Sequence, residues 1–306
     1  AAAQRGGDGG EQLIALRVLT GMAAAGLVPL SLAMVGDSLP YEQRQVAMSR
    51  ITAGFTLGQV MAGPVGGVFG DTLGWRGVFV VIGALALLVF GLLVRRLAVR
   101  PGLAGSGGGT EGGYRALAAN PQARLLLAIT LVEGALFAGT FPFLAPFLRQ
   151  QWSLSYSMVG LVLAFFGLGG LVYAALARRM VPALGETRLV LLGGSVLVLA
   201  LSGMLSVPGW QIFPLFQAML GFGYFTAHGV LQARATELLP QARATAVSVF
   251  ALTLFLGQSI GALGLGNASA AFGFPAALAA ATLGILLLTF WLAWIVRRPA
   301  GVAQEA

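Results

Sequence analysis

Three ionisable side chains, Glu133, His228 and Arg17, stand inside long apolar stretches of the sequence, where a charge is costly and therefore indicates a function. A carboxyl group deep in a membrane can hold a proton near neutral pH, as a proton carrier must. Histidine also exchanges protons near physiological pH and can relay them. Arginine stays charged and can pair with an anion. These three residues are therefore the first candidates for proton or substrate coupling.

The spacing of these residues from flanking arginines gives their depth in the predicted helices. Glu133 follows Arg124 by nine residues, which at ~1.5 Å per residue places it ~14 Å from that end. His228 precedes Arg234 by six residues, a depth of ~9 Å by the same rise. These depths leave contact between Glu133 and His228 open.

Each of the three residues also has a structural interpretation. Glu133 can serve only as a hydrogen-bond partner between helices, and a single buried histidine often only packs. Arg17 can extend along its helix to reach the outer membrane interface.

The composition excludes a water-soluble fold. The 306 residues are 58% hydrophobic and only 9% charged. A soluble domain carries roughly 25% charged residues, so the chain has too little polar surface to cover a globule. Residues 125–147 and 275–296 are almost free of charge and exceed the ~20 residues that cross a bilayer. The sequence predicts an all-α, multi-pass membrane protein embedded in a lipid bilayer.

Other classes of function are excluded by the residues that are missing. The sequence has no cysteine and one histidine, so neither a thiolate nor a multi-histidine metal site is expected. No motif combines a nucleophile, a base and an orienting group, so we expect neither an enzyme nor a cofactor. The net charge of +8 comes from arginines, which collect in the cytoplasmic loops of membrane proteins. Nucleic acid is therefore not an expected partner.

Nine transmembrane helices are predicted from the apolar runs. Runs of ~20 apolar residues fit helices, whereas barrel strands alternate over ~10 residues. The expected spans are 12–36, 46–70, 75–97, 124–148, 154–177, 188–207, 210–233, 244–266 and 273–296.

Arginine predicts which ends of these helices face the cytoplasm. One side of the predicted membrane carries fourteen arginines and the other carries only Arg5, Arg76 and Arg149. The richer side is expected to be cytoplasmic, which places the N-terminus outside and the C-terminus inside. Abundant alanine, glycine and arginine indicate a bacterial source, so the inner membrane is the expected location.

The predicted domains follow from one polar linker. Residues 98–122 include the Gly/Ser-rich run 105–109 and have the composition of a flexible cytoplasmic tether. Three helices precede the tether, in residues 1–97, and six follow it, in residues 123–298. A cytoplasmic tail is expected at 299–306.

An internal repeat explains the odd number of helices. Three residues of the first part recur 200 positions later: Gly21, Asp37 and Pro40 match Gly221, Glu237 and Pro240. Six more recur 199 positions later: Arg44, Ala47, Ser49, Gly58, Gln59 and Gly74 match Arg243, Ala246, Ser248, Gly257, Gln258 and Gly273. Helices one to three therefore match helices seven to nine. Two-lobed transporters contain such parallel repeats, so the repeat predicts three further helices ahead of the first.

These patterns resemble the major facilitator superfamily, and within it the twelve-helix drug:proton antiporters. The first helix is similar to the superfamily's fourth-helix motif, with Leu13, Arg17, Thr20, Gly21, Ala23, Ala24 and Ala25. The second is similar to the fifth-helix antiporter motif, with Gly54, Gly58, Gly63, Pro64, Gly66 and Gly67. The residues that follow, Asp71, Gly74, Trp75, Arg76 and Phe79, resemble the lead-in to the sixth helix. The antiporter motif occurs once, because Ala262 and Leu263 stand where a second copy would have Gly-Pro.

The resemblance implies a role for several of these residues. The motif glycines would form a tight contact with the other lobe, kinked at Pro64, that limits leak and shapes alternating access. Generic packing of small residues between helices is the alternative. Arg17 would pair with an acidic group on an absent first helix or with an anionic substrate. A degenerate copy of the superfamily's hallmark loop is expected around Arg178, Arg179, Gly185 and Arg188, without its acidic member.

Weaker predictions concern residues at helix ends and on cavity-facing helices. Asp37, Arg44, Glu237 and Arg243 are candidates for ion-pairing latches at the cytoplasmic side. Gln59 and Gln258 can reach a substrate or cross-bond helices. Five aromatic residues suit a hydrophobic or cationic substrate, or alternatively the core: Phe137, Phe141, Phe143, Tyr224 and Phe225.

The function expected from the sequence is proton-coupled efflux of a small hydrophobic or drug-like molecule by alternating access. The full-length protein would be a monomer that takes a small-molecule substrate and protons as its partners. A sugar or metabolite porter is the nearest alternative, and it would need more polar cavity residues. A non-transporting, truncated remnant is the other alternative, because the chain supplies three of the four helices expected around a central cavity.

Overall fold

The computed structural model describes residues 15–22, 41–97, 110–239 and 242–297. Within these ranges every regular element is a helix, which confirms the predicted all-α class. Helices satisfy each backbone hydrogen bond within one segment, as a lipid environment requires. The chain forms two compact units, one from residues 1–55 and 89–107 and the other from residues 56–88 and 108–306.

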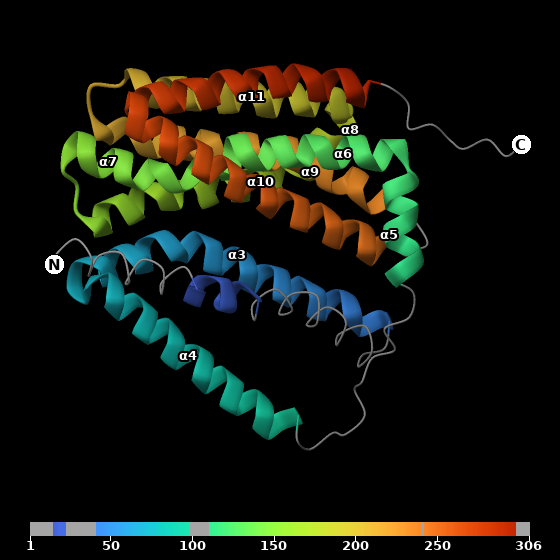
Figure 1. Ribbon diagram of the computed structural model, residues 1–306, viewed down its shortest axis with the longest axis horizontal. Helices are drawn as coiled ribbons and strands as arrows, with labels where there is room; N and C mark the ends of the chain where they lie inside the picture. Colours follow the sequence, from blue (N-terminus) through green and yellow to red (C-terminus); the bar gives the residue numbers. More distant parts are fainter. Residues whose placement is uncertain (1–14, 23–40, 98–109, 240–241, 298–306) are drawn as a thin grey trace, which may run out of the picture. The chain divides into compact units, whose positions relative to one another are not determined.

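Residues 15–22 form a short helical segment, and the further elements follow in chain order (Figure 1). The first are α3 (Tyr41–Thr72), α4 (Gly74–Leu97), α5 (Thr110–Ala119) and α6 (Pro121–Glu133). Two short helices, η1 (Gly134–Ala138) and η2 (Phe141–Phe143), lead into α7 (Leu144–Trp152). The remaining elements are α8 (Tyr156–Ser206), η3 (Trp210–Ile212), α9 (Phe213–Glu237), α10 (Arg243–Phe272) and α11 (Phe274–Val296).

Five helical segments among the described residues are long and apolar enough to cross a membrane: Arg76–Arg95, Pro121–Trp152, Tyr156–Ser206, Thr245–Phe272 and Phe274–Val296. The third of these contains two predicted spans, 154–177 and 188–207. Gly185 separates them, because its backbone (φ 68°, ψ 168°) is not helical and falls in a region that side chains disfavour. This segment is therefore two helices that meet at a sharp turn.

The predicted linker differs from its expectation in one respect. Residues 110–119 form α5 instead of continuing a flexible tether, and Figure 1 shows this helix across the ends of α6 and α10. Leu117 is buried in a small cluster with Ala123, Leu239 and Ala246. Glycine-rich composition indicated flexibility, but burial of this one leucine favours an ordered helix.

Glycines bring the backbones of α8 and α9 into close contact. A side chain at Gly169 would meet the carbonyl group of Ala218, and one at Gly221 would meet that of Phe166. Gly193 and Gly223 face each other in the same way. Small residues at a helix crossing permit such an approach in membranes, where packing rather than the hydrophobic effect holds helices together. This crossing fixes the position of α9.

The span from Pro121 to Trp152 changes its helix type in the middle. After Glu133 the chain winds into the π-helix η1, in which the amide of Gly139 donates to the carbonyl of Gly134, 2.8 Å away and five residues back. Pro142 has no amide hydrogen, so regular α-helical bonding cannot continue through it. Side chains at Gly134 and Gly139 would collide with the α10 backbone. Glu133 therefore lies where an α-helix widens, a feature that is frequent at functional sites.

We predict opposite effects for two glycine-to-alanine changes. Gly221→Ala should destabilise the protein by about 1–3 kcal/mol, because the added methyl group overpacks the crossing with α8. Gly264→Ala should stabilise it by up to about 1 kcal/mol, because alanine favours a helix and the added methyl group would meet nothing within 4 Å. Thermal melting in one detergent measures both. Equal shifts of the two melting temperatures would contradict the close crossing.

Candidate functional site

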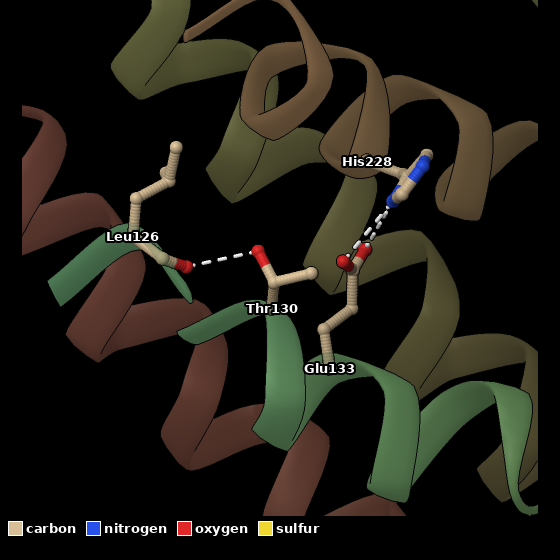
Figure 2. A network of polar contacts seen from close by, with 4 residues as sticks. All are labelled: Leu126, Thr130, Glu133 and His228. Carbon is tan, nitrogen blue, oxygen red and sulfur yellow. Dashed lines mark hydrogen bonds and ion pairs between the residues drawn. The ribbon is translucent and has the colours of Figure 1, made fainter. Parts of the chain in front are cut away.

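Glu133 and His228 form a buried pair between α6 and α9. The Nδ1 atom of His228 lies 3.1 Å from Oε1 and 3.0 Å from Oε2 of Glu133 (Figure 2). The residues are 6% and 9% exposed. Figure 2 shows the two side chains reaching toward each other from separate helices. Two of the three predicted coupling residues are thus brought together across 95 residues of sequence.

The contact can exist in two forms that share one proton. When Glu133 is ionised, Nδ1–H of a protonated His228 donates to the carboxylate. When Glu133 is protonated, its hydroxyl donates to the bare Nδ1 of a neutral imidazole. Both forms have no net charge, whereas gain or loss of one proton leaves a net charge in an apolar region at high cost.

An aromatic stack holds the imidazole in place. Tyr224 lies parallel to His228, with ring centres 4.9 Å apart and planes 13° apart. Phe137 stacks on the other face of Tyr224 at 4.2 Å and 12°. Phe137 follows Glu133 by four residues in one segment, and His228 follows Tyr224 by four residues in α9. Residues four apart on a helix lie on the same face, which brings these side chains together. Phe250 of α10 adds a tilted contact to the imidazole at 5.5 Å.

Further aromatic rings extend this surface away from the pair. Phe166 of α8 contacts Phe137, Tyr224 and Phe225, with ring centres 6.0, 6.1 and 5.7 Å away. Phe141 lies 4.8 Å from Phe166. Four of the five aromatic residues named from the sequence therefore form one cluster, which we call the aromatic cluster. The fifth, Phe143, packs instead near Phe274, at 6.3 Å.

Thr130 lies one turn before Glu133 and is fully buried. Its hydroxyl donates to the carbonyl of Leu126 in the same helix, 2.9 Å away (Figure 2). The hydroxyl group of Thr130 therefore has its hydrogen-bond partner within α6. His228 thus remains the side chain that contacts the carboxylate.

The other predicted residues include several exposed side chains and some that lie outside the described residues. Arg17 is exposed and lies in segment 15–22, in the other compact unit. Glu237 and Arg243 form an exposed ion pair of 3.5 Å near the α9–α10 connection, and such pairs contribute little stability. Asp37 and the side chains of Arg44 and Gln59 lie outside the described part, and Gln258 is half-buried on α10.

The antiporter-motif glycines divide into two groups. Side chains at Gly63 and Gly67 would meet the α8 backbone at Gly160 and Tyr156. Side chains at Gly54, Gly58 and Gly66 would meet nothing within 4 Å. The helix α3 continues through Pro64, which removes one hydrogen bond to the preceding turn.

Two polar features of the structure were not predicted from the sequence. The first is Glu186, which directly follows Gly185 and was not named among the residues of the loop expected there. Its Oε2 atom lies 2.6 Å from Nη2 of Arg234, and Arg234 also donates to the carbonyl of Val296 at 3.0 Å. The second feature is Gln217, fully buried on α9, whose amide atoms have no hydrogen-bond partner among the described residues. Its spacing of seven and eleven residues from Tyr224 and His228 is the signal that places it on their face.

No group of three or more His, Asp or Glu side chains that could hold a metal ion occurs in the part of the chain that the structure describes.

Comparison with known proteins finds one matching family model and several relatives. The family model of the Major Facilitator Superfamily matches residues 10–141. A probable sugar efflux transporter of Pasteurella multocida is 28% identical over 230 residues, which are 74% of this chain and 55% of that protein. One from Helicobacter pylori strain J99 is 30% identical and covers 73% of this chain and 56% of its own length. A chloramphenicol resistance protein of Streptomyces lividans is 32% identical over 202 residues, 65% of this chain and 48% of that protein.

A solved structure shows the same fold. The crystal structure of a bacterial homologue of the human lysosomal transporter Spinster, inward-facing and unoccupied, matches with a TM-score of 0.70 at 20% identity. The match covers 89% of this chain and 74% of that one.

The long apolar helices and their close glycine crossings are those of a multi-pass helical membrane protein. Its relatives are named as transporters, in agreement with the prediction that the chain is not an enzyme. The similarity to the major facilitator superfamily that the sequence motifs indicated is thereby confirmed. The chain spans about half the length of the curated relatives it matches.

We predict that the two members of the buried pair depend on each other for stability. His228→Leu should cost about 3–5 kcal/mol, because it leaves Glu133 buried without its partner. The double change Glu133→Leu with His228→Leu should recover most of that loss, because no buried charge remains. Thermal melting of the single and double variants measures the coupling.

Gln217→Leu is the matched control for this experiment. It removes a buried polar group from the same face of α9, and it should not destabilise the protein because the lost amide has no partner among the described residues. A double variant as unstable as the sum of its single changes would contradict the pairing.

Proposed function

We propose that the protein carrying this chain is a proton-coupled efflux transporter of a small hydrophobic or drug-like molecule. The observation that supports this most is the buried pair of Glu133 and His228, which combines a carboxyl group and an imidazole in an apolar lobe. An isolated ionisable group in that position is costly, so its presence calls for a function. Exchange of one proton between the two side chains would be such a function. The printed names of the relatives, which describe efflux and drug resistance, agree with export.

In this proposal the protonation of the pair selects between two conformations. A pair without net charge is compatible with tight closure of the apolar packing around it. An extra proton leaves a net positive charge that favours contact with water, and hence the conformation in which the site faces one side of the membrane. Substrate bound at the adjacent aromatic cluster would favour loss of that proton. Export of one molecule is thereby linked to import of protons.

The direction of transport rests on the proposed orientation. The arginine distribution supports an orientation with the N-terminal end of α6 and the C-terminal ends of α9 and α11 at the cytoplasm. The opposite ends, including Asp71 and Tyr156, then face the outside. We propose a bacterial inner-membrane protein, monomeric at full length, with its C-terminus inside.

We predict that Glu133→Gln abolishes efflux driven by a proton gradient while leaving substrate exchange in the absence of a gradient. Glutamine keeps the shape and hydrogen bonding of the side chain but cannot carry a proton. Chloramphenicol efflux from proteoliposomes with an imposed pH difference measures transport driven by the gradient. Counterflow of labelled chloramphenicol measures substrate exchange without a gradient. The experiment uses the chain and a version extended at its N-terminus by three helices from a relative.

Glu186→Gln is the matched control, because this carboxylate is about half-exposed and pairs with Arg234. It should retain efflux driven by the gradient. Efflux that stays coupled to the pH difference in Glu133→Gln would contradict the proposal.

Sugar export is a second candidate function, favoured by the names of the Pasteurella and Helicobacter relatives. The residues near the pair argue against it, because rings of Phe137, Phe141 and Phe166 offer few hydrogen bonds to hydroxyl groups. We therefore predict that chloramphenicol competes with the exported substrate and that lactose does not. Competition by lactose alone, measured as inhibition of counterflow, would favour the sugar transporter.

A further inference from the structure

Two glycine-rich helices meet within one compact unit, the second half of α3 and the first half of α8. A Cβ atom at Gly63 would lie 2.7 Å from the carbonyl oxygen of Gly160, and one at Gly67 would collide with the backbone of Tyr156. Further along α8, a Cβ atom at Gly167 would lie 3.3 Å from the Cβ atom of Val60. The two backbones are therefore in contact over about ten residues of each helix.

Asp71, in the last turn of α3, closes this contact at one end. Its Oδ1 atom accepts from the amide of Tyr156 at 2.9 Å, and its Oδ2 atom accepts from the amide of Ser157 at 2.7 Å. These are the first two amides of α8, which the helix itself cannot satisfy. The next one, at Met158, donates to the hydroxyl of the regular N-cap, Ser155. A residue 85 positions away in the sequence thus accepts two of these three capping hydrogen bonds.

The charge of Asp71 strengthens the cap. A carboxylate interacts favourably with the positive end of a helix, and both of its hydrogen bonds are charge-assisted. Arg149 of α7 lies over the ring of Tyr156, 3.5 Å from its centre, and its charge acts on Asp71. The ring of Tyr156 in turn packs against Gly70. Asp71, Arg149 and Tyr156 therefore form one connected cluster at the junction.

This cluster differs from the buried pair in its response to pH. Hydrogen bonds from the side chain and backbone of Ser157, together with the charge of Arg149, lower the pKa of Asp71 below its ordinary value of 3.8. A lowered pKa means that the cap is present above the ordinary value and is lost only as the pH falls through the lowered one. The cap therefore persists across physiological pH, and it holds the helices without carrying the coupling proton.

We infer that Asp71 is the latch of the outer gate: its carboxylate holds α3 to the first turn of α8 while the outer side is closed, and the latch must release for the site to open outward. The inference rests on the proposed orientation and on alternating access. Asp71 acts through the position of α8 and does not contact the buried pair. It is a positioning residue for the conformational change.

The absence of cysteine from the sequence makes a direct test possible. In a variant with Val60→Cys and Gly167→Cys, the two Cβ atoms would lie 3.3 Å apart. This is just below the roughly 3.5–4.5 Å that is usual in disulfides, so oxidation reports how often α3 and α8 are in contact. The rate of disulfide formation with copper phenanthroline is measured in membranes for this variant. The same rate is then measured after adding Asp71→Ala, Asp71→Asn or, as a control, Thr72→Ala.

Thr72 is the matched control because it is exposed, adjacent to Asp71, and donates to the carbonyl of Val68 in its own helix. We expect Asp71→Ala to slow disulfide formation about tenfold, Asp71→Asn to give an intermediate rate, and Thr72→Ala to give the unchanged rate. Melting temperatures of the reduced proteins should stay close to one another, which separates gate opening from general destabilisation.

The result also separates this inference from the proposed function. Slower cross-linking in Asp71→Ala would support the latch even if proton coupling failed in Glu133→Gln. An unchanged rate in Asp71→Ala, or an equal loss in Thr72→Ala, would overturn the latch and leave the role of the buried pair standing. Oxidised Val60→Cys/Gly167→Cys protein should lose all transport, and a reducing agent should restore it. Full transport by the oxidised protein would also overturn the latch.

Discussion

The contact between Glu133 and His228 is the interaction on which the proposed proton coupling depends. Neither side chain is stable alone in an apolar interior, and each makes burial of the other possible. The surroundings of the pair serve this contact. Tyr224 stacks on the imidazole and Phe137 stacks on Tyr224. The close crossing of α8 with α9 fixes the helix from which the imidazole projects. Burial of two ionisable groups is costly, and the proposed exchange of their proton would account for it.

The backbone around Glu133 is as specialised as its side chain. The π-helix that begins at Gly134 widens the span directly after the carboxylate, and Pro142 prevents a return to regular bonding for several residues. Such segments are easier to rearrange than a continuous α-helix. Asp71 works in a different way, because it caps α8 through hydrogen bonds that physiological pH does not disturb. In the proposed mechanism one carboxylate exchanges its proton, and the other holds two helices together.

Much of this could be predicted from the sequence, and the part that could not depends on register. Glu133 and His228 were identified because ionisable residues are rare in apolar runs, and the glycines of α3 because their spacing predicts a groove. The contact between Glu133 and His228 was left open, because their relative height depends on the π-helix and on where α9 crosses α8. Glu186 was overlooked because its role depends on Arg234, 48 residues away. The ordered helix α5 was not predicted because its segment follows a glycine-rich run, although Leu117 within it is buried.

The central claim, that the buried pair carries the coupling proton, is tested most directly by running the transporter in reverse. Proteoliposomes with a trapped pH-sensitive dye are given a chloramphenicol gradient and no pH gradient, and the resulting movement of protons is recorded. The account predicts proton flow opposite to the flow of chloramphenicol in the wild-type protein. It predicts none in Glu133→Gln, while chloramphenicol exchange continues. Proton flow of equal size in the Glu133→Gln variant would contradict the assignment of the coupling proton to this pair.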